Sequence, residues 1–263
     1  MRTCVNCGVD NSHKFCPECG QKMEVKRVSF RTIAEEFFSK WIGFDNQFGR
    51  TVLDMTIRPG IVVNAYLSGN RTRYIGPLGY VVIMTALLII SFDLFGLEVG
   101  DFLKQNSDTF NPAGNQAISE DQAKMQQSVM EFMAKNFRFM AAIMIPFFAI
   151  SLGWFYRREK LNYIERAVVT TYLSCHGMWI TMAMLGILAL SGHLFNVTGM
   201  ILSIVYYAFA LHKCFPRRNF MLGFVKTVGV YVSAILLFTL FALIVGIGIG
   251  ILIAIFNPEM IQS

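Results

Sequence analysis

Four cysteines near the N-terminus are the residues whose type and spacing most clearly indicate chemistry. Cys4 and Cys7 form one Cys-x-x-Cys pair, and Cys16 and Cys19 form a second pair eight residues later. In each pair two thiolates from one tight turn reach the same ion, and four thiolates close a tetrahedral zinc site that leaves no position for water. The spacing therefore predicts one structural zinc ion, with iron or a redox dithiol as alternatives.

The residues around the cysteines fit a zinc ribbon over residues 1–24. Gly8 and Gly20 each follow the second cysteine of a pair, where the turn needs a residue that tolerates positive φ. About twenty residues cannot bury a core large enough to fold alone, so the metal is expected to supply the folding free energy. His13 lies in the connecting loop and is a substitute ligand that four thiolates make unnecessary. No apolar signal segment precedes the cysteines, which predicts a reducing cytoplasmic location.

The composition of the chain indicates a membrane protein. Hydrophobic residues make up 54% and charged residues 15%, with a mean hydropathy of +0.49, whereas soluble domains carry about 25% charged residues. The net charge of +6 suits attraction to anionic lipid. Nucleic-acid binding is not expected, because the ribbon's basic residues are not interleaved with base-stacking aromatics.

Five apolar runs are long enough, or nearly so, to cross a hydrocarbon core of about 30 Å as helices. They cover residues 77–97, 138–156, 166–190, 194–212 and 223–256, with an outside loop at 98–136 and a tail at 257–263. The sequence therefore predicts an all-α integral membrane helical bundle of about five transmembrane helices. The second half of the loop, from Ser119 to Asn136, is expected to be helical, and its first half to be a polar loop.

The basic residues orient these spans. Residues 1–76, 157–166 and 213–222 together hold 18 of the 23 Lys and Arg, whereas the loop at 98–136 holds three. By the positive-inside rule the N-terminus is expected in the cytoplasm and the C-terminus outside.

The last apolar run is too long for one simple crossing, since 34 residues rise about 50 Å as a helix. Tilt, a cytoplasmic overhang or a break are the open explanations. Gly246 and Gly250 form a Gly-x-x-x-Gly pattern that permits close helix contact, within this protomer or across a dimer.

The segment 25–76 is expected to form cytoplasmic amphipathic helices at 29–43, 45–58 and 59–68. The apolar stripe of the first helix consists of Phe30, Ile33, Ala34, Phe37, Phe38, Trp41 and Ile42. Such stripes lie either in the headgroup region or against the cytoplasmic ends of the spans. Arg71, Arg73 and Tyr74 directly precede the first span. They are predicted to be a positive-inside anchor with an aromatic-belt residue, or a site for phosphate headgroups.

Ionisable residues at membrane depth are candidates for function. Asp93 and Arg138 lie near the outer ends of their spans and are expected to form an ion pair, or alternatively a substrate or proton site. His176 lies near the middle of the third span, where hydrogen bonding to a Ser or Thr is the expectation. The enzyme motifs we sought, such as phosphate-binding glycine loops and His-Glu-x-x-His, are not present, so no enzymatic activity is expected.

Two stretches resemble a bacterial family of unknown function numbered 3667. The first runs from Cys4-x-Asn6-Cys7 to Cys19-Gly20-Gln21, with Arg31 and Glu35 after it. The second runs from Thr51-Val-Leu-Asp54 through Arg58-Pro59-Gly60 to Tyr74-Ile-Gly-Pro77. The resemblance implies a zinc-ribbon-headed, multi-pass protein of the bacterial inner membrane, and it implies no activity.

Two functions follow as hypotheses. In the first, the ribbon and interfacial helices are an adaptor module that docks a protein partner of a membrane-associated assembly, while the spans anchor the chain in the lipid bilayer and homo-oligomerisation stays open. In the alternative, the bundle is a transporter or lipid-handling protein with a path that reaches Asp93, Arg138 or His176.

Overall fold

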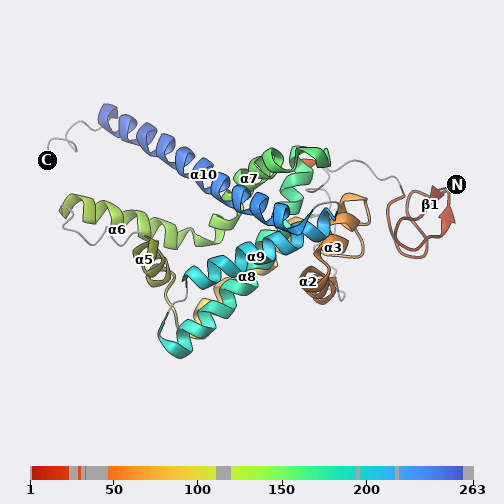
Figure 1. Cartoon of the computed structure of the whole chain (residues 1–263), viewed down its shortest axis with the longest axis horizontal. Coiled ribbons are helices and arrows are strands. Elements are labelled where there is room, and N and C mark those ends of the chain that lie inside the picture. The colour runs from red at the N-terminus through yellow and green to blue at the C-terminus, as the bar shows by residue number, and fades with distance from the viewer. Residues whose placement is uncertain are drawn as a thin grey trace.

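The computed structural model of the chain describes residues 2–23, 29–30, 33, 47–110, 120–193, 196–216 and 219–256. A small ribbon lies at one end of the molecule, and a helical bundle makes up the rest (Figure 1). The amphipathic helix expected at 29–43 falls outside the described residues except at Phe30 and Ile33, and the tail at 257–263 falls outside them altogether.

Five helices within the described part of the chain are long and apolar enough to cross a membrane. They are α4 (Pro77–Phe95), α7 (Phe137–Phe155), α8 (Tyr163–Ser191), α9 (Asn196–Cys214) and α10 (Phe220–Phe256). Each starts within about three residues of the expected span, because hydropathy and flanking Pro and Gly residues mark the ends. The predicted helical membrane bundle is therefore confirmed.

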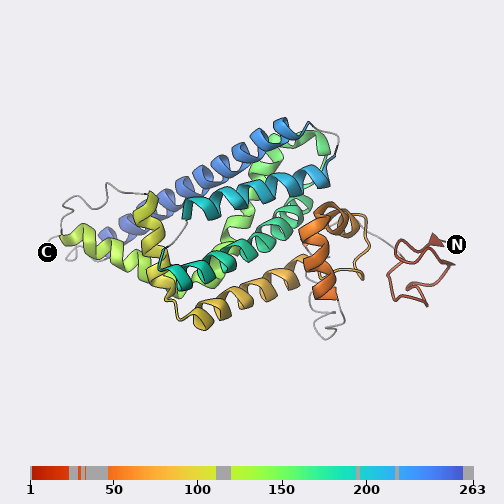
Figure 2. The same ribbon diagram turned by 60° about the horizontal axis from the view of Figure 1, so that its bottom comes forward.

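Helix α8 is the centre of the bundle, because α4, α7 and α9 all pack against it. Figure 2 shows α4, α8 and α9 running side by side. The core between the helices is rich in aromatic residues, and Tyr80, Tyr172 and Tyr207 are at most 1% exposed. The Asn162 side chain and Glu165 begin α8 with a reciprocal capping box. This cap fixes where the central helix starts.

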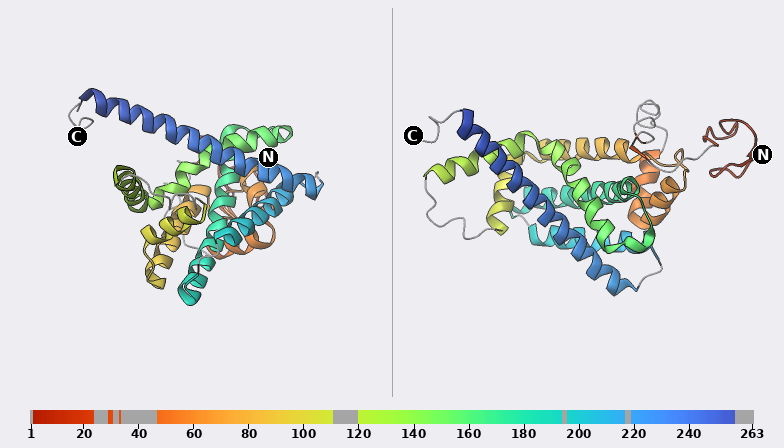
Figure 3. Two further views of the ribbon diagram at one scale, coloured as in Figure 1. Left: turned by 60° about the vertical axis from the view of Figure 1, so that its left-hand side comes forward. Right: turned by 90° about the horizontal axis from the view of Figure 1, so that it is seen from above.

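Helix α10 is one unbroken helix, which settles how the longest apolar run folds. It packs on α7 and α9 and then continues beyond them (Figure 3). In the most apolar stretch of α10 only 11% of the residues are buried, whereas the share is 28–31% in the other four spans. Gly246 has no neighbouring atom within 4 Å of an added Cβ, so it makes no close helix contact with the part of the protomer that the structure describes. Gly250 lies one turn further on, where only the backbone is described.

The segment between the first two spans differs from expectation in its first half. Residues Val99–Phe110 form helix α5, where a polar loop was predicted, while Glu120–Lys135 form α6 as expected. The polar side chains at 106–108 made this stretch resemble a loop in the sequence, although α5 also has an apolar side. Its residue Phe102 packs edge-on against Phe92 with ring centroids 5.4 Å apart.

Two short helices, α2 (Gln47–Ile57) and α3 (Pro59–Leu67), cover the bundle at the ribbon's end (Figure 1). Pro59 separates them, since it has no N–H to continue α2 and suits the first turn of α3. Helix α3 packs on α8 and α9, and α2 packs on α8. At Gly60 the two backbones touch, because an added Cβ would collide with the carbonyl oxygen of Lys213. We call α2 and α3 the cap.

The N-terminal ribbon has almost no apolar core of its own. Strands β1 (Arg2–Thr3) and β2 (Asp10–Asn11) pair antiparallel, and an isolated bridge joins Phe15 to Lys22. Its buried hydrophobic cluster within the described residues consists of Cys4, Cys16 and Met23. Something other than hydrophobic burial must hold this segment together.

Candidate metal centre and its attachment to the cap

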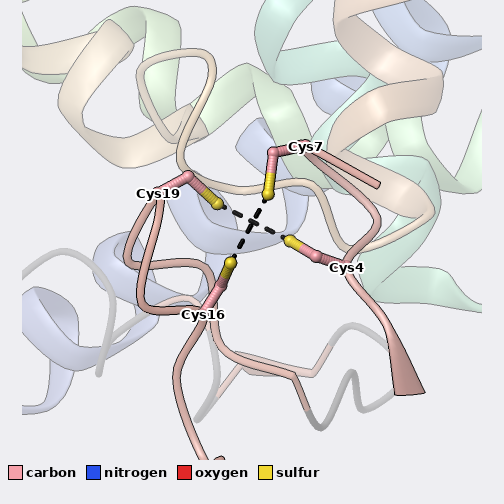
Figure 4. Close-up of side chains that lie close together, drawn as sticks. All are labelled: Cys4, Cys7, Cys16 and Cys19. Atoms are coloured by element: carbon pink, nitrogen blue, oxygen red, sulfur yellow. Dashed lines mark hydrogen bonds between the residues drawn. The ribbon is translucent and has the colours of Figure 1, made fainter. Parts of the chain in front are cut away.

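The four predicted cysteines converge on one point. Their sulfur atoms all lie within 4.8 Å of one another, and Figure 4 shows the four side chains pointing inward from two loops. The Sγ atoms of Cys4 and Cys19 are 3.6 Å apart, and those of Cys7 and Cys16 are 3.4 Å apart. These distances are too long for disulfides, in which sulfurs are bonded at about 2.05 Å.

Each cysteine pair is shaped by the backbone turn that carries it. The N–H of Gly8 donates to the carbonyl of Cys4, and the N–H of Gly20 donates to the carbonyl of Cys16, both at 2.9 Å. Both glycines have positive φ, +76° and +70°, as their place after each pair predicted. The two turns are therefore near copies that present their sulfurs to a common centre.

The geometry fits a tetrahedral metal ion. Zn–S bonds of about 2.3 Å require sulfurs about 3.8 Å apart, close to the 3.4 and 3.6 Å observed. The backbone N–H of His13 donates to the side chain of Asn11, and His13 is not a member of the four-residue cluster. The cluster can therefore bind a metal with four thiolates and without the histidine.

The two cysteines of the first pair differ in how readily they ionise. Burial opposes the ionisation of Cys4, but the backbone N–H groups of Cys7 and Asn6 and two neighbouring thiols donate to its sulfur. The net effect lowers the pKa of Cys4 to about 6. In Cys7 the N–H of Val9 favours the thiolate, but proton sharing with Cys16, burial and two other sulfurs raise its pKa to about 12. The Cys4 thiolate thus forms near neutral pH, whereas an incoming metal must displace the proton of Cys7.

Two amide side chains attach the ribbon to the chain directly before α4. Gln21, only 3% exposed, donates from Nε2 to the carbonyl of Gly69 at 2.7 Å and accepts from the hydroxyl of Thr72 at 3.1 Å. From the other cysteine turn, Asn6 accepts from Nδ2 of Asn70 at 3.0 Å. Both cysteine turns are therefore hydrogen-bonded to the turn at residues 69–72. These bonds require that the ribbon is folded.

The same turn is fixed to the cap and the bundle. Gln47 of α2 donates to the carbonyl of Thr72 at 2.9 Å, and the hydroxyl of Thr51 accepts from the N–H of Ile75 at 3.1 Å. From α8, the Tyr172 hydroxyl donates to the carbonyl of Ile75 at 2.6 Å. Residues 69–75 are therefore the junction at which ribbon, cap and spans meet.

Tyr74 is part of this junction and not of an aromatic belt. It is 1% exposed, and its hydroxyl donates to Oδ2 of Asp54 at 2.7 Å. The prediction that Tyr74 faces lipid is wrong, because pairing with Asp54 draws the ring inward. Arg71 lies over the ring of Tyr66 at 5.4 Å, and Arg73 lies over Tyr74 at 5.5 Å. Their predicted role toward lipid headgroups stays a prediction.

Asp54 is the buried charge of the cap. Burial opposes its ionisation, but the Tyr74 hydroxyl and the Arg58 guanidinium, which donates at 2.8 Å, outweigh this cost. The pKa of Asp54 therefore lies below its usual value. Burial and the bond to the carboxylate raise the pKa of Tyr74. The cap therefore contains a buried carboxylate that is charged at neutral pH.

His176 is engaged on both sides of its ring. Nδ1 lies 2.8 Å from the hydroxyl of Tyr80, and Nε2 lies 3.1 Å from the hydroxyl of Thr56. The expected Ser or Thr partner is therefore found, although it belongs to α2 and not to a span. Since Tyr80 stands in the first turn of α4, His176 is level with the start of that helix. Its ring ties the cap to the bundle.

Asp93 and Arg138 do not form the expected ion pair. Both are exposed, and no salt bridge joins these two described residues. The Arg138 guanidinium lies instead over the ring of the adjacent Phe139, 5.2 Å from its centroid. The ion-pair prediction is wrong, although the two helix ends do meet: the neighbouring rings of Phe92 and Phe137 lie 5.5 Å apart, while both charged side chains are exposed. Neither these residues nor His176 adds support to a path through the bundle.

The contacts of the junction were not predicted from the sequence. Asn6, Gln21, Asp54 and Asn70 all lie in the two stretches whose motifs were compared with family 3667 in the sequence analysis. Their place in those stretches was the available signal. It could not show that residues 48 or 64 positions apart are hydrogen-bonded.

Fold and site together define a class: a multi-pass, membrane-type helical bundle with an N-terminal four-cysteine ribbon. Residues 45–89 match the family model described as Protein of unknown function (DUF3667). The resemblance to family 3667 is thereby confirmed over the cap, the junction and the first two-thirds of α4. No curated protein and no solved structure matches the chain.

Proposed function

We propose that this protein is a non-enzymatic adaptor of the bacterial inner membrane. Its zinc-loaded ribbon, supported by the cap, docks a protein partner at the cytoplasmic face, while the spans anchor the assembly. The zinc ion is structural, and the N-terminus is cytoplasmic. The basic segments support this orientation, because the ribbon, the cap and the Arg157–Glu159 turn lie at the same end of the bundle (Figure 2).

The observation that carries the proposal is the pairing of a closed metal centre with a fixed attachment. Four sulfurs leave no coordination position for a substrate, so such a metal can fold the ribbon but cannot act on a ligand. The attachment through Asn6 and Gln21 presents the ribbon at the end of the bundle. A module held at the end of the bundle by hydrogen bonds from both cysteine turns is suited to recognition.

The ribbon also has a surface suited to a protein partner. Val5 is 51% exposed and Phe15 is 52% exposed. The ribbon leaves both apolar side chains outside its small core. Exposed apolar and aromatic side chains are common anchors in protein interfaces. Phe15 lies beside the second cysteine pair, so the metal centre holds it in place.

The test compares partners of the full chain extracted in native nanodiscs. Phe15→Ser removes the exposed ring but keeps all four ligands, Cys16→Ser removes a ligand, and Cys214→Ala is the control because Cys214 lies outside the metal cluster. We expect a stoichiometric partner with the wild type and Cys214→Ala, and its loss from the other two variants, with zinc retained in Phe15→Ser. An identical set of partners in all four samples would contradict the adaptor role.

A further inference from the structure

One face of the cap is apolar and exposed. In α2 and α3 the side chains of Thr51, Asp54, Met55, Val62 and Val63 are buried against the bundle. On the opposite side Leu53 is 58% exposed, Ile57 55% and Ile61 42%. Leu53 and Ile57 are four apart in α2 and so share one face of that helix, and Ile61 is the exposed apolar residue at the start of α3. We call Leu53, Ile57 and Ile61 the cap stripe.

Positive charge flanks the cap stripe. Arg50 lies on the exposed side of α2, and the side chain of Arg58 is 59% exposed. The acidic residue of α2 and α3 is Asp54, whose buried carboxylate accepts from the Tyr74 hydroxyl and pairs with Arg58, so Arg50 supplies the net positive charge. The exposed charge on this face is therefore positive, which is the pattern of helices that lie on anionic lipid.

The level of the cap stripe along the bundle follows from α4. Its 19 residues rise roughly 28 Å, which is just enough to cross a hydrocarbon core of about 30 Å. The first turn of α4, which carries Tyr80, must therefore lie at one membrane boundary. His176 bridges Tyr80 to Thr56, so the residue before Ile57 lies at that same boundary.

A second marker gives the same level. Trp179 follows His176 by one turn of α8 and is 37% exposed. Exposed tryptophans are enriched where hydrocarbon meets headgroups. Both markers therefore place the end of α2, where Ile57 follows Thr56, at the level of the membrane boundary.

We infer that the cap stripe is a lipid-binding face: Leu53, Ile57 and Ile61 enter the headgroup layer, and Arg50 selects anionic phospholipids. The cap thus has two packed sides, one against the spans and one against the bilayer surface. This inference is independent of what the ribbon docks, and it holds or fails without any partner.

The experiment places a single tryptophan at each of three positions in the full chain. Trp41, Trp154 and Trp179 are first changed to Phe, and Ile57→Trp, Val5→Trp and Leu240→Trp are then made separately. The exposed fractions of the three sites are closely matched at 55%, 51% and 54%. Each protein is reconstituted in nanodiscs, and its fluorescence is quenched by acrylamide from water or by lipids brominated near the headgroup.

We expect Ile57→Trp to be quenched by the brominated lipid, as Leu240→Trp is, and to be shielded from acrylamide, whereas Val5→Trp shows the reverse. Quenching of Ile57→Trp by acrylamide alone would overturn the inference, because the face would then lie in water. Protection from both quenchers would also overturn it, since a protein segment would then cover the stripe.

The choice of lipid is tested with brominated phosphatidylglycerol and brominated phosphatidylcholine at equal dilution. Phosphatidylglycerol should quench Ile57→Trp more strongly, and Arg50→Gln should reduce that preference by up to about fivefold, the equivalent of one basic residue near an anionic surface. Lys104→Gln on α5 is the control and should leave the preference for phosphatidylglycerol unchanged. Equal quenching by the two lipids before any change of Arg50 would overturn the anionic selectivity.

Discussion

The ribbon and the bundle are stabilised in opposite ways. In the ribbon the buried hydrophobic cluster consists of two cysteines and a methionine, whereas the bundle and cap share one large cluster that includes five tyrosines with at most 1% exposure, Tyr66, Tyr74, Tyr80, Tyr172 and Tyr207. On the proposal that the four sulfurs bind a metal, the ribbon depends on that metal and the bundle on packing. The difference leads us to expect that the ribbon unfolds without the bundle when the metal is removed, and that the hydrogen bonds to residues 69–72 are then lost.

Loss of a metal ligand is the change with the largest expected effect. Structural zinc contributes about 10–16 kcal/mol in small metal-folded domains. Cys4→Ser and Cys16→Ser should therefore lose bound zinc, while Cys175→Ala and Cys214→Ala keep one ion per chain. Elemental analysis of the purified chains measures this. Zinc that persists in both ligand variants would contradict the assignment of the site.

Gly60→Ala should destabilise the contact between cap and bundle. The added methyl group would collide with the backbone at Lys213, and overpacking of this kind costs about 1–3 kcal/mol. Thermal unfolding of the detergent-solubilised chain should show a lower midpoint. Gly177→Ala is the matched control, since no atom lies within 4 Å of its added Cβ. Equal midpoints for the two variants would show that α3 does not pack on α9 this closely.

Asp54→Asn should change how the stability of the cap depends on pH. Because the pKa of Asp54 is lowered in the folded chain, its contribution is present above the unfolded pKa and is lost as the pH falls through the folded pKa. At neutral pH the substitution should cost about 1–3 kcal/mol. Unfolding midpoints measured from pH 7 down to acid should converge for wild type and variant. Parallel curves would contradict a charged Asp54.

Gln21→Ala has the smallest expected effect. It removes the hydrogen bonds to Gly69 and Thr72, each worth about 1 kcal/mol, but it leaves the four cysteines intact. Zinc content should stay unchanged, while limited proteolysis within residues 69–72 becomes faster. Gln127→Ala is the control, because its bond to Glu131 lies on exposed α6. Unchanged cleavage at the turn would show that the ribbon is not held there.

The sequence was sufficient for the parts that follow from local pattern. Hydropathy located the five spans, Pro59 separated α2 from α3, and the Cys-x-x-Cys spacing identified the four cysteines that cluster. These features depend on residues close together in the chain. A helix was missed at α5 because its apolar contacts come from another helix and its own sequence reads as polar.

Long-range pairing was beyond prediction. The position of Tyr74 next to a span suggested an aromatic-belt residue. Its hydroxyl instead donates to Asp54, which lies twenty positions earlier in the chain. Asp93 and Arg138 suggested an ion pair by charge and depth alone, but the Arg138 guanidinium lies over the ring of Phe139 instead. A single sequence shows which residues are polar, but the partner of each polar residue is known only from the packed structure.

The most direct test of the account is hydrogen–deuterium exchange of the full chain in nanodiscs, with and without a zinc chelator. We expect residues 2–23 to lose nearly all protection when the metal is removed and the turn at 69–72 to lose part of it, while α4, α7, α8 and α9 remain protected. Protection of residues 2–23 that survives complete removal of the metal would contradict a ribbon folded by its four sulfurs.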